Sequence, residues 1–196
     1  LYLFGRYKDG LHTWVFDDTN NAWSQLPMLP DLSDANGWIE PGYYRTIKTV
    51  AIGVKLFVLG RLGDGVHTWY IDLRYNTWRK VTSQDGLYPG FTDARSFNNP
   101  ECYLTIRASA HDGHLILVGR STQGIETYTL LILGDEFPLF TWTSFPGFNP
   151  PWADTSGWSN AACYETIQLF KALDVLWLLG SGPNGIELNV LALEDI

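Results

Sequence analysis

The chain has 196 residues, of which 45% are hydrophobic, 17% charged and 15% aromatic, and this composition excludes a disordered chain. That length fits one domain or at most two small ones. The net charge of −8 argues against nucleic acid and anionic membranes as partners, because both attract clustered Lys and Arg.

The N-terminal segment introduces a pattern that recurs along the chain. Leu3–Arg6 is followed by Gly10 and then by Leu11–Trp14. The same arrangement returns with these glycine pairs: Gly60 and Gly65, Gly119 and Gly124, Gly180 and Gly185. Two short apolar runs on either side of a glycine turn are typical of a β-hairpin. The sequence therefore predicts four similar hairpins.

Two further apolar runs accompany the hairpins. One contains Trp23 and recurs at Trp78 and Trp142. The other precedes the next hairpin, and we expect strands at Tyr44–Ile47, Tyr103–Ile106 and Tyr164–Ile167. This gives 14 strands, divided 3, 4, 4 and 3. Because a lone four-stranded sheet exposes both faces, radial stacking of such sheets is the expected solution.

We therefore predict an all-β fold: a β-propeller of four-stranded antiparallel blades, about four of them in this chain. Residues 1–196 form a single domain with units of about 1–52, 53–112, 113–172 and 173–196. The strand count is two short of four full blades, which leaves three interpretations open. The end blades are thin, the chain is part of a larger propeller, or it forms a homo-oligomer through unpaired edge strands.

The repeats resemble known propeller families. Leu3–Arg6 with Thr13–Asp17 and Trp23 looks like a kelch repeat, as does Val58–Arg61 with Trp69–Asp72 and Trp78. Kelch repeats carry Gly-Gly where this chain has Gly-Arg or Gly-Ser. The run from Asp112 to Glu126 also resembles repeats of the fungal and bacterial propeller lectins. The resemblance implies a propeller that binds either proteins or glycans.

Three long connections carry the candidate binding residues. In each, an Asp lies two residues after a large apolar residue and four before an aromatic ring. The pairs are Asp34 with Trp38, Asp93 with Phe97, and Asp154 with Trp158. A ring that stacks on a sugar and a carboxylate that accepts its hydroxyls would form a lectin site, repeated three times. The alternative is structural: each Asp caps its own turn, while the ring fills a gap between blades.

Arginine follows the glycine of the first three hairpins, at Arg6, Arg61 and Arg120. Guanidinium groups suit sugar hydroxyls and carboxylates, so these residues are secondary candidates for ligand binding. Their alternative role is to pair with surface carboxylates.

No metal site, cofactor or catalytic residue is predicted. His12 and His67 occupy one repeat position, where later units carry Glu126 and Glu187, and this favours a solvated or interblade hydrogen-bonding position. Cys102 and Cys163 share another position, and we expect buried thiols there, not a disulfide.

The preferred hypothesis is a multivalent lectin whose partners are glycans or glycoproteins, with no enzymatic activity. A kelch-like platform for protein interactions is the alternative, and a glycosidase-type enzyme is a less favoured third.

Overall fold

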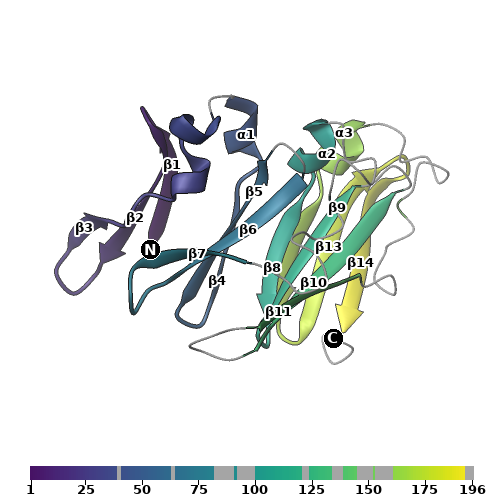
Figure 1. The fold of residues 1–196 in the computed structure, drawn as a ribbon. Helices are drawn as coiled ribbons and strands as arrows, with labels where there is room; N and C mark the ends of the chain where they lie inside the picture. The colour runs from purple at the N-terminus through teal and green to yellow at the C-terminus, as the bar shows by residue number, and fades with distance from the viewer. Residues whose placement is uncertain are drawn as a thin grey trace.

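The structure is a computed structural model. It describes residues 1–38, 41–62, 65–81, 91, 100–120, 124–133, 139–144, 152 and 161–192. These residues form four antiparallel sheets that follow one another in chain order (Figure 1). Sheet I contains β1 (Tyr2–Tyr7), β2 (Gly10–Asp17) and β3 (Ala22–Gln25). Sheet II contains β4 (Lys48–Ile52), β5 (Lys55–Leu62), β6 (Gly65–Asp72) and β7 (Thr77–Lys80). Sheet III contains β8 (Arg107–His111), β9 (His114–Arg120), β10 (Ile125–Leu133) and β11 (Leu139–Ser144). Sheet IV contains β12 (Gln168–Ala172), β13 (Val175–Gly182) and β14 (Gly185–Ala192).

Short helices connect the sheets. They are η1 (Pro30–Leu32), η2 (Asp34–Asn36), α1 (Pro41–Arg45), α2 (Pro100–Leu104) and α3 (Ala161–Glu165). The three α-helices lie at the same end of the sheets (Figure 1). Over the described residues the all-β class and the division into 3, 4, 4 and 3 strands are confirmed.

The four predicted hairpins are present as β1–β2, β5–β6, β9–β10 and β13–β14. The second glycine of each pair has a positive φ: 149° at Gly10, 156° at Gly65, 137° at Gly124 and 107° at Gly185. Residues with a Cβ rarely adopt this conformation, so the turn itself requires glycine at this repeat position.

Sheets II and III are each buried on both faces. Leu56 and Val58 of β5 pack toward sheet I, whereas Phe57 and Leu59 pack toward sheet III. Strand β9 alternates in the same way, with Leu117 facing sheet II. Successive side chains of a strand point to opposite faces, and a strand between two sheets is therefore continuously apolar. The core of this protein is a series of layers between stacked sheets.

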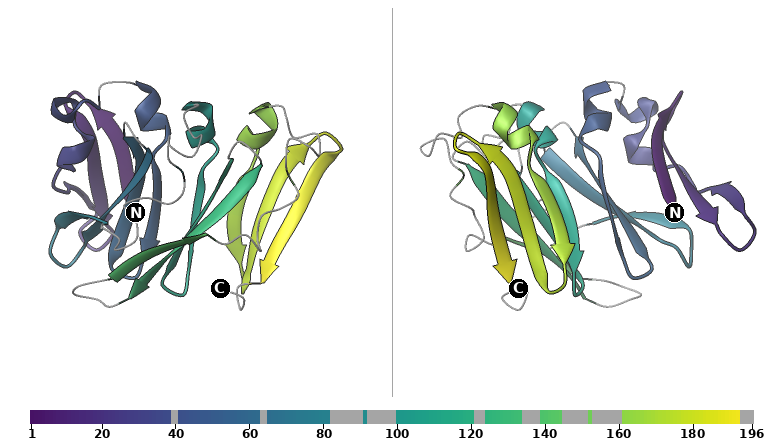
Figure 2. Two further views of the ribbon diagram at one scale, coloured as in Figure 1. Left: turned by 45° about the vertical axis from the view of Figure 1, so that its right-hand side comes forward. Right: turned by 180° about the vertical axis from the view of Figure 1, so that it is seen from behind.

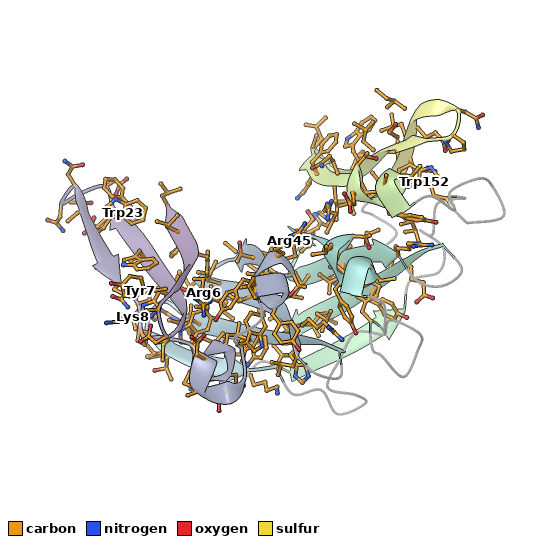
Figure 3. The ribbon with its side chains drawn as sticks, turned by 90° about the horizontal axis from the view of Figure 1, so that it is seen from above. Arg6, Tyr7, Lys8, Trp23, Arg45 and Trp152 are labelled. Atoms are coloured by element: carbon orange, nitrogen blue, oxygen red, sulfur yellow. The ribbon has the colours of Figure 1, made fainter. Side chains whose placement is uncertain are left out.

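The stacked sheets form a curve. The first strands of sheets II, III and IV contact one another in order, β4 with β8 and β8 with β12. Seen along the sheets from above, the four sheets follow one another around an open arc (Figure 3), and the side views show their strands running between the same two ends (Figure 2).

The first strands of sheets II, III and IV do not begin where the sequence predicted. The segments at Tyr44–Ile47, Tyr103–Ile106 and Tyr164–Ile167 were expected to be strands. Instead each contains the end of a short α-helix and the turn that follows it. One helical turn is too short to show a period of 3.6 residues, so the Tyr-rich pattern was misassigned.

A repeated threonine explains why these helices stop. The Thr46 hydroxyl donates to the Tyr43 carbonyl at 2.6 Å and accepts from the Arg61 backbone N–H at 3.0 Å. Thr105 and Thr166 make the equivalent contacts. The hydroxyl therefore ties the helix end to the second strand of the following sheet, and the first strand begins two residues later.

The predicted unit boundaries after residues 52, 112 and 172 fall in the turns of the β4–β5, β8–β9 and β12–β13 hairpins. Each boundary separates two paired strands of one sheet. The strands of sheets II, III and IV instead begin at residues 48, 107 and 168.

Candidate functional site

A guanidinium over a tyrosine ring recurs at three junctions between successive sheets. Each arginine is the last or second-to-last residue of a strand in one sheet, and each tyrosine lies in the helix that leads to the next sheet. The distances from Cζ to the ring centroid are 5.1 Å for Arg6 over Tyr44, 4.7 Å for Arg61 over Tyr103 and 4.6 Å for Arg120 over Tyr164. Cation–π stacking of this kind favours arginine over lysine.

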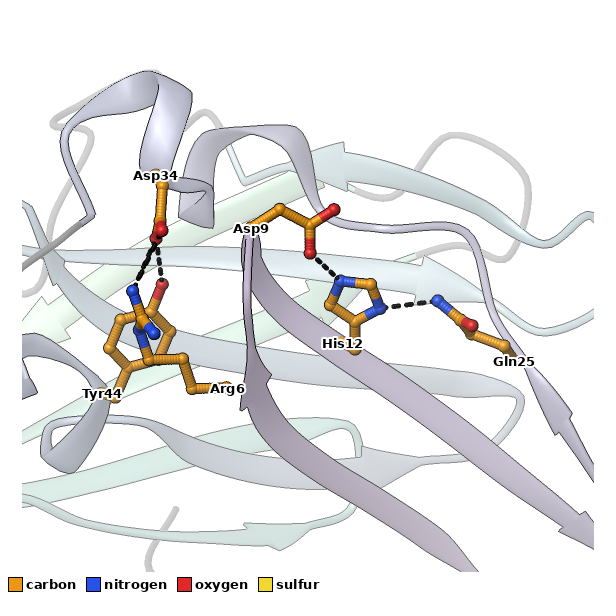
Figure 4. Close-up of polar contacts among 6 residues, drawn as sticks. All are labelled: Arg6, Asp9, His12, Gln25, Asp34 and Tyr44. Carbon is orange, nitrogen blue, oxygen red and sulfur yellow. Dashed lines mark hydrogen bonds and ion pairs between the residues drawn. The ribbon is translucent and has the colours of Figure 1, made fainter.

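Asp34 completes the first of these junctions (Figure 4). Arg6 Nη2 donates to the two carboxylate oxygens of Asp34 at 3.0 and 3.2 Å, and the Tyr44 hydroxyl donates to Oδ1 at 3.2 Å. The side chains of Arg6 and Asp34 remain 39% and 27% exposed. The structure thus brings together Arg6 and Asp34, two of the predicted ligand-binding residues, at an open position.

The cluster keeps unused hydrogen-bonding capacity. A guanidinium has five N–H donors and a carboxylate about four acceptor positions, and the contacts above use only part of each. Burial raises the pKa of Tyr44, and the Asp34 carboxylate raises it further, so Tyr44 stays a hydroxyl donor at neutral pH. Vicinal hydroxyls of a ligand would meet donors and acceptors side by side.

Trp38 lies beneath this cluster, in the core. Its ring is 1% exposed, and it packs against Tyr43 and Tyr44 at centroid distances of 5.7 and 5.1 Å. The expectation that Trp38 offers its face to a sugar does not fit this position, because a buried ring has no free face. Trp38 supports the loop from the inside, and its Nε1–H has no hydrogen-bond partner among the described residues.

The loop that carries Asp34 is fixed to both neighbouring sheets. The Asp34 backbone N–H donates to the Asp9 carbonyl at 3.1 Å, in the β1–β2 turn. Asp31 accepts a 2.8 Å hydrogen bond from Trp69 Nε1, in β6 of sheet II. Rigid placement of a polar pair on an anchored loop is a property of preformed ligand sites.

The equivalent residues at the next two junctions, Asp93, Phe97, Asp154 and Trp158, lie outside the described residues. The residues that precede them are described. Phe91 and Trp152 are 0% and 1% exposed, and their carbonyls accept from Val66 and Ile125 N–H at 3.0 and 3.2 Å. Phe91 and Trp152 therefore each combine a buried ring with a backbone carbonyl that is hydrogen-bonded to the preceding sheet.

His12 and His67 are buried, so the solvated position considered for them is wrong. They are 8% and 3% exposed, and each stacks on a tryptophan of its own strand, at 5.7 and 5.8 Å. An Nε2-protonated His12 satisfies both of its polar contacts (Figure 4): it donates to Asp9 at 2.7 Å and accepts from Gln25 at 2.6 Å. These contacts remain within sheet I.

Cys102 is buried and Cys163 half-buried, and neither forms a disulfide bond within the described part of the chain. Among the described residues no group of three or more His, Cys, Asp or Glu is arranged to hold a metal ion. Within the same part of the chain, no helix has both the length and the apolar character needed to cross a membrane.

Sequence reasoning missed the role of the repeated tyrosines. Tyr44, Tyr103 and Tyr164 recur in step with Thr46, Thr105 and Thr166, which was a signal for a common local structure. Their stacking partners are 38 to 44 residues away in sequence, in a different sheet, and no local pattern connects them.

Comparison with other proteins gives no family for this chain: no family model matches it, and no curated protein sequence matches it.

Proposed function

We propose that this protein is a multivalent carbohydrate-binding protein, a lectin, whose sites lie where one sheet meets the next. The observation that carries the proposal is the Arg6–Asp34–Tyr44 cluster. It places the charged acceptor Asp34, on an anchored loop, beside a charged donor from β1 and a hydroxyl from α1, at a solvent-accessible position. Sugars present adjacent hydroxyls that donate and accept, and charge-assisted hydrogen bonds to them are the strong ones.

Repetition extends the proposal to the other junctions. The Arg-over-Tyr stack recurs with Arg61 and Arg120, and sequence equivalence assigns Asp93 and Asp154 the part that Asp34 has in the first cluster. Several weak sites on one rigid body bind clustered glycans with an avidity far above that of a single site. We therefore expect weak binding of monosaccharides and much tighter binding of multivalent glycans.

A glycan array followed by calorimetry tests the proposal. Asp34→Asn removes the charge of the acceptor without changing its shape, and we expect about tenfold weaker affinity at that site. Asp18→Asn is the matched control, because this substitution makes the same change of charge at an exposed position, in the β2–β3 turn. Array signals should fall stepwise as Asp34, Asp93 and Asp154 are replaced in combination.

The proposal fails if no immobilised glycan is retained and a monosaccharide panel leaves tryptophan fluorescence unchanged. Retention of one protein partner after glycans are removed would favour the alternative, a kelch-like platform for protein interactions.

We further propose that the stacked sheets are blades of a β-propeller. Supporting this are the contacts between first strands and the burial of sheets II and III on both faces.

The end sheets leave the corresponding positions exposed: Leu3 is 54% exposed where Val58 is 0%, and Ile186 is 79% exposed where Ile125 is 4%. Such apolar faces favour stacking of a further sheet, and a second copy of this chain could supply it. Light scattering on wild type and Ile186→Lys should then show a dimer that the substitution disrupts; a concentration-independent monomer contradicts the dimer.

A further inference from the structure

A hollow of about 390 Å³ opens on the concave side of the arc, where the first strands of three sheets begin. Two repeat positions line it, each contributed three times. The helix ends contribute Arg45, Leu104 and Glu165, and the strand starts contribute Lys48, Arg107 and Gln168. Figure 3 shows Arg45 on this inner side, away from Arg6. The hollow is therefore separate from the Arg–Tyr junctions.

Positive charge predominates in this hollow. Arg45, Lys48 and Arg107 face a single carboxylate, that of Glu165. Among the described residues, no ion pair joins any of these three cations to a carboxylate. The chain as a whole is acidic, at −8, so this concentration of uncompensated cations is the opposite of its average surface.

Arg107 is held rigidly without being neutralised. Its Nε donates to the Ile167 carbonyl at 2.6 Å, and its Nη groups donate to the carbonyls of Leu104 at 2.8 Å, Ile106 at 3.0 Å and Glu165 at 3.0 Å. Carbonyl oxygens fix the guanidinium plane between sheets III and IV but carry no net charge. The cation is thus preorganised, and its full charge remains available to a ligand.

Lys48 is half-buried, and its ammonium has no hydrogen-bond or ion-pair partner among the described residues. Burial lowers the pKa of Lys48, and the nearby Arg107 charge lowers it further. Burial also lowers the pKa of Arg107, and the Glu165 carboxylate opposes part of this shift. Two partly desolvated cations that repel each other are unfavourable alone, and an anion between them would relieve both costs.

We propose that this hollow binds a small oxyanion, a carboxylate, sulfate or phosphate group, between Lys48 and Arg107, with the exposed Arg45 as a third contact. Such a group accepts several charge-assisted hydrogen bonds at once, which matches the donors present. The group can be a free inorganic ion or the acidic substituent of a saccharide, since the hollow is open to solvent and larger than one ion.

Calorimetric titration of the full chain tests this. The titrants are sodium sulfate, sodium phosphate and sodium glucuronate, with sodium chloride at matched ionic strength as the reference. We expect saturable binding of at least one oxyanion, weakened about tenfold by Lys48→Gln and by Arg45→Gln. Glu165→Gln should tighten binding several-fold, because it removes the carboxylate that competes with the ligand. Arg79→Gln on β7 makes the same change of charge at an exposed position and should have no effect.

The titrants also separate the two sources. Binding of sulfate or phosphate supports a free ion as the ligand, and binding of glucuronate alone supports an acidic sugar. The proposal is overturned if chloride produces the same response, or if both Lys48→Gln and Arg45→Gln bind like the wild type. Should Lys48→Gln fail to fold, Arg45→Gln decides, since Arg45 is exposed and its side chain makes no hydrogen bond or ion pair among the described residues. This site does not depend on the lectin proposal: loss of oxyanion binding leaves the Asp34 cluster intact, and the reverse also holds.

Discussion

Replacement of the first glycine of each hairpin by alanine gives a sharp test of the stacked-sheet core. A Cβ at Gly60 would lie 2.9 Å from Trp38 Cη2 and 3.2 Å from Trp38 Cζ2. A Cβ at Gly119 would lie 3.0 Å from Ile106 Cγ1 and 3.1 Å from Phe91 Cζ. A Cβ at Gly5 would meet no atom within 4 Å. These three glycines occupy the same position in the repeat, but they differ in which side-chain atoms a Cβ would contact.

Overpacking of a closed core costs about 1–3 kcal/mol, whereas Gly→Ala at a compatible backbone position stabilises by about 0.4–1 kcal/mol through the unfolded chain. Trp38 is 1% exposed and wedged between tyrosines, so it cannot move aside easily. We expect Gly60→Ala to lower the free energy of unfolding by about 1–2 kcal/mol, Gly119→Ala by somewhat less, and Gly5→Ala to be neutral or slightly stabilising.

Urea unfolding followed by tryptophan fluorescence and circular dichroism measures these differences. With a urea m-value of about 2 kcal/mol/M, in the middle of the usual range, the midpoint of Gly60→Ala should fall by about 0.5–1 M. Adding Trp38→Phe removes the two ring atoms nearest to the new Cβ, so the double variant should show a favourable coupling energy. The reasoning is refuted if Gly60→Ala is as stable as Gly5→Ala, or if Trp38→Phe brings no relief.

Three further outcomes are expected. Thr105→Val should lower the free energy of unfolding by about 1–3 kcal/mol, because it leaves the part-buried Arg120 N–H without its acceptor and removes one of two donors to the Cys102 carbonyl. Thr166→Val, in the exposed copy of the same turn, should cost less, and thermal unfolding compares the two variants. Hydrogen bonds from Arg74 hold the pKa of Asp72 at about 2, below the usual 3.8, so its carboxylate stabilises the fold above about pH 4 and this contribution is lost as pH falls toward 2. Asp72→Asn should therefore flatten the acid limb of the stability curve by about 1–2 kcal/mol, and an unchanged acid limb would contradict the assignment. Asp34→Asn should change stability by less than about 1 kcal/mol, since it alters an exposed pair, and a large loss would show that the cluster serves mainly to join the sheets.

The hairpins could be predicted from the sequence because they depend on local signals. The strand count agrees as well, although the three segments 44–47, 103–106 and 164–167 that were counted as strands are helix ends followed by turns. Alternating or continuous apolar runs specify strands, and a glycine with positive φ specifies the turn between them, as at Gly10 and Gly65. Because the pattern recurs, the same signals predict a hairpin at four places in the chain.

Only part of the candidate site could be predicted from the sequence. Arg6 and Asp34 were both singled out, but their pairing across 28 residues was not predicted. Two roles were open for Trp38, a ring that stacks on a sugar or a ring that fills a gap between blades, and its burial excludes the first. A tryptophan four residues after an aspartate has the same spacing whether its ring faces a ligand or the core. Only the position of the next sheet, with Gly60 against the ring, decides between these two environments.

By itself the sequence determined the all-β class, the four hairpins and the repeated residues that recur with them. Tertiary structure alone decided that each arginine covers a tyrosine in the helix that leads to the next sheet. It also decided that Lys48 and Arg107 line one hollow on the concave side of the arc. The physical reason is range: backbone conformation responds to residues a few positions apart, whereas charge clusters and buried rings depend on which sheets stack against each other.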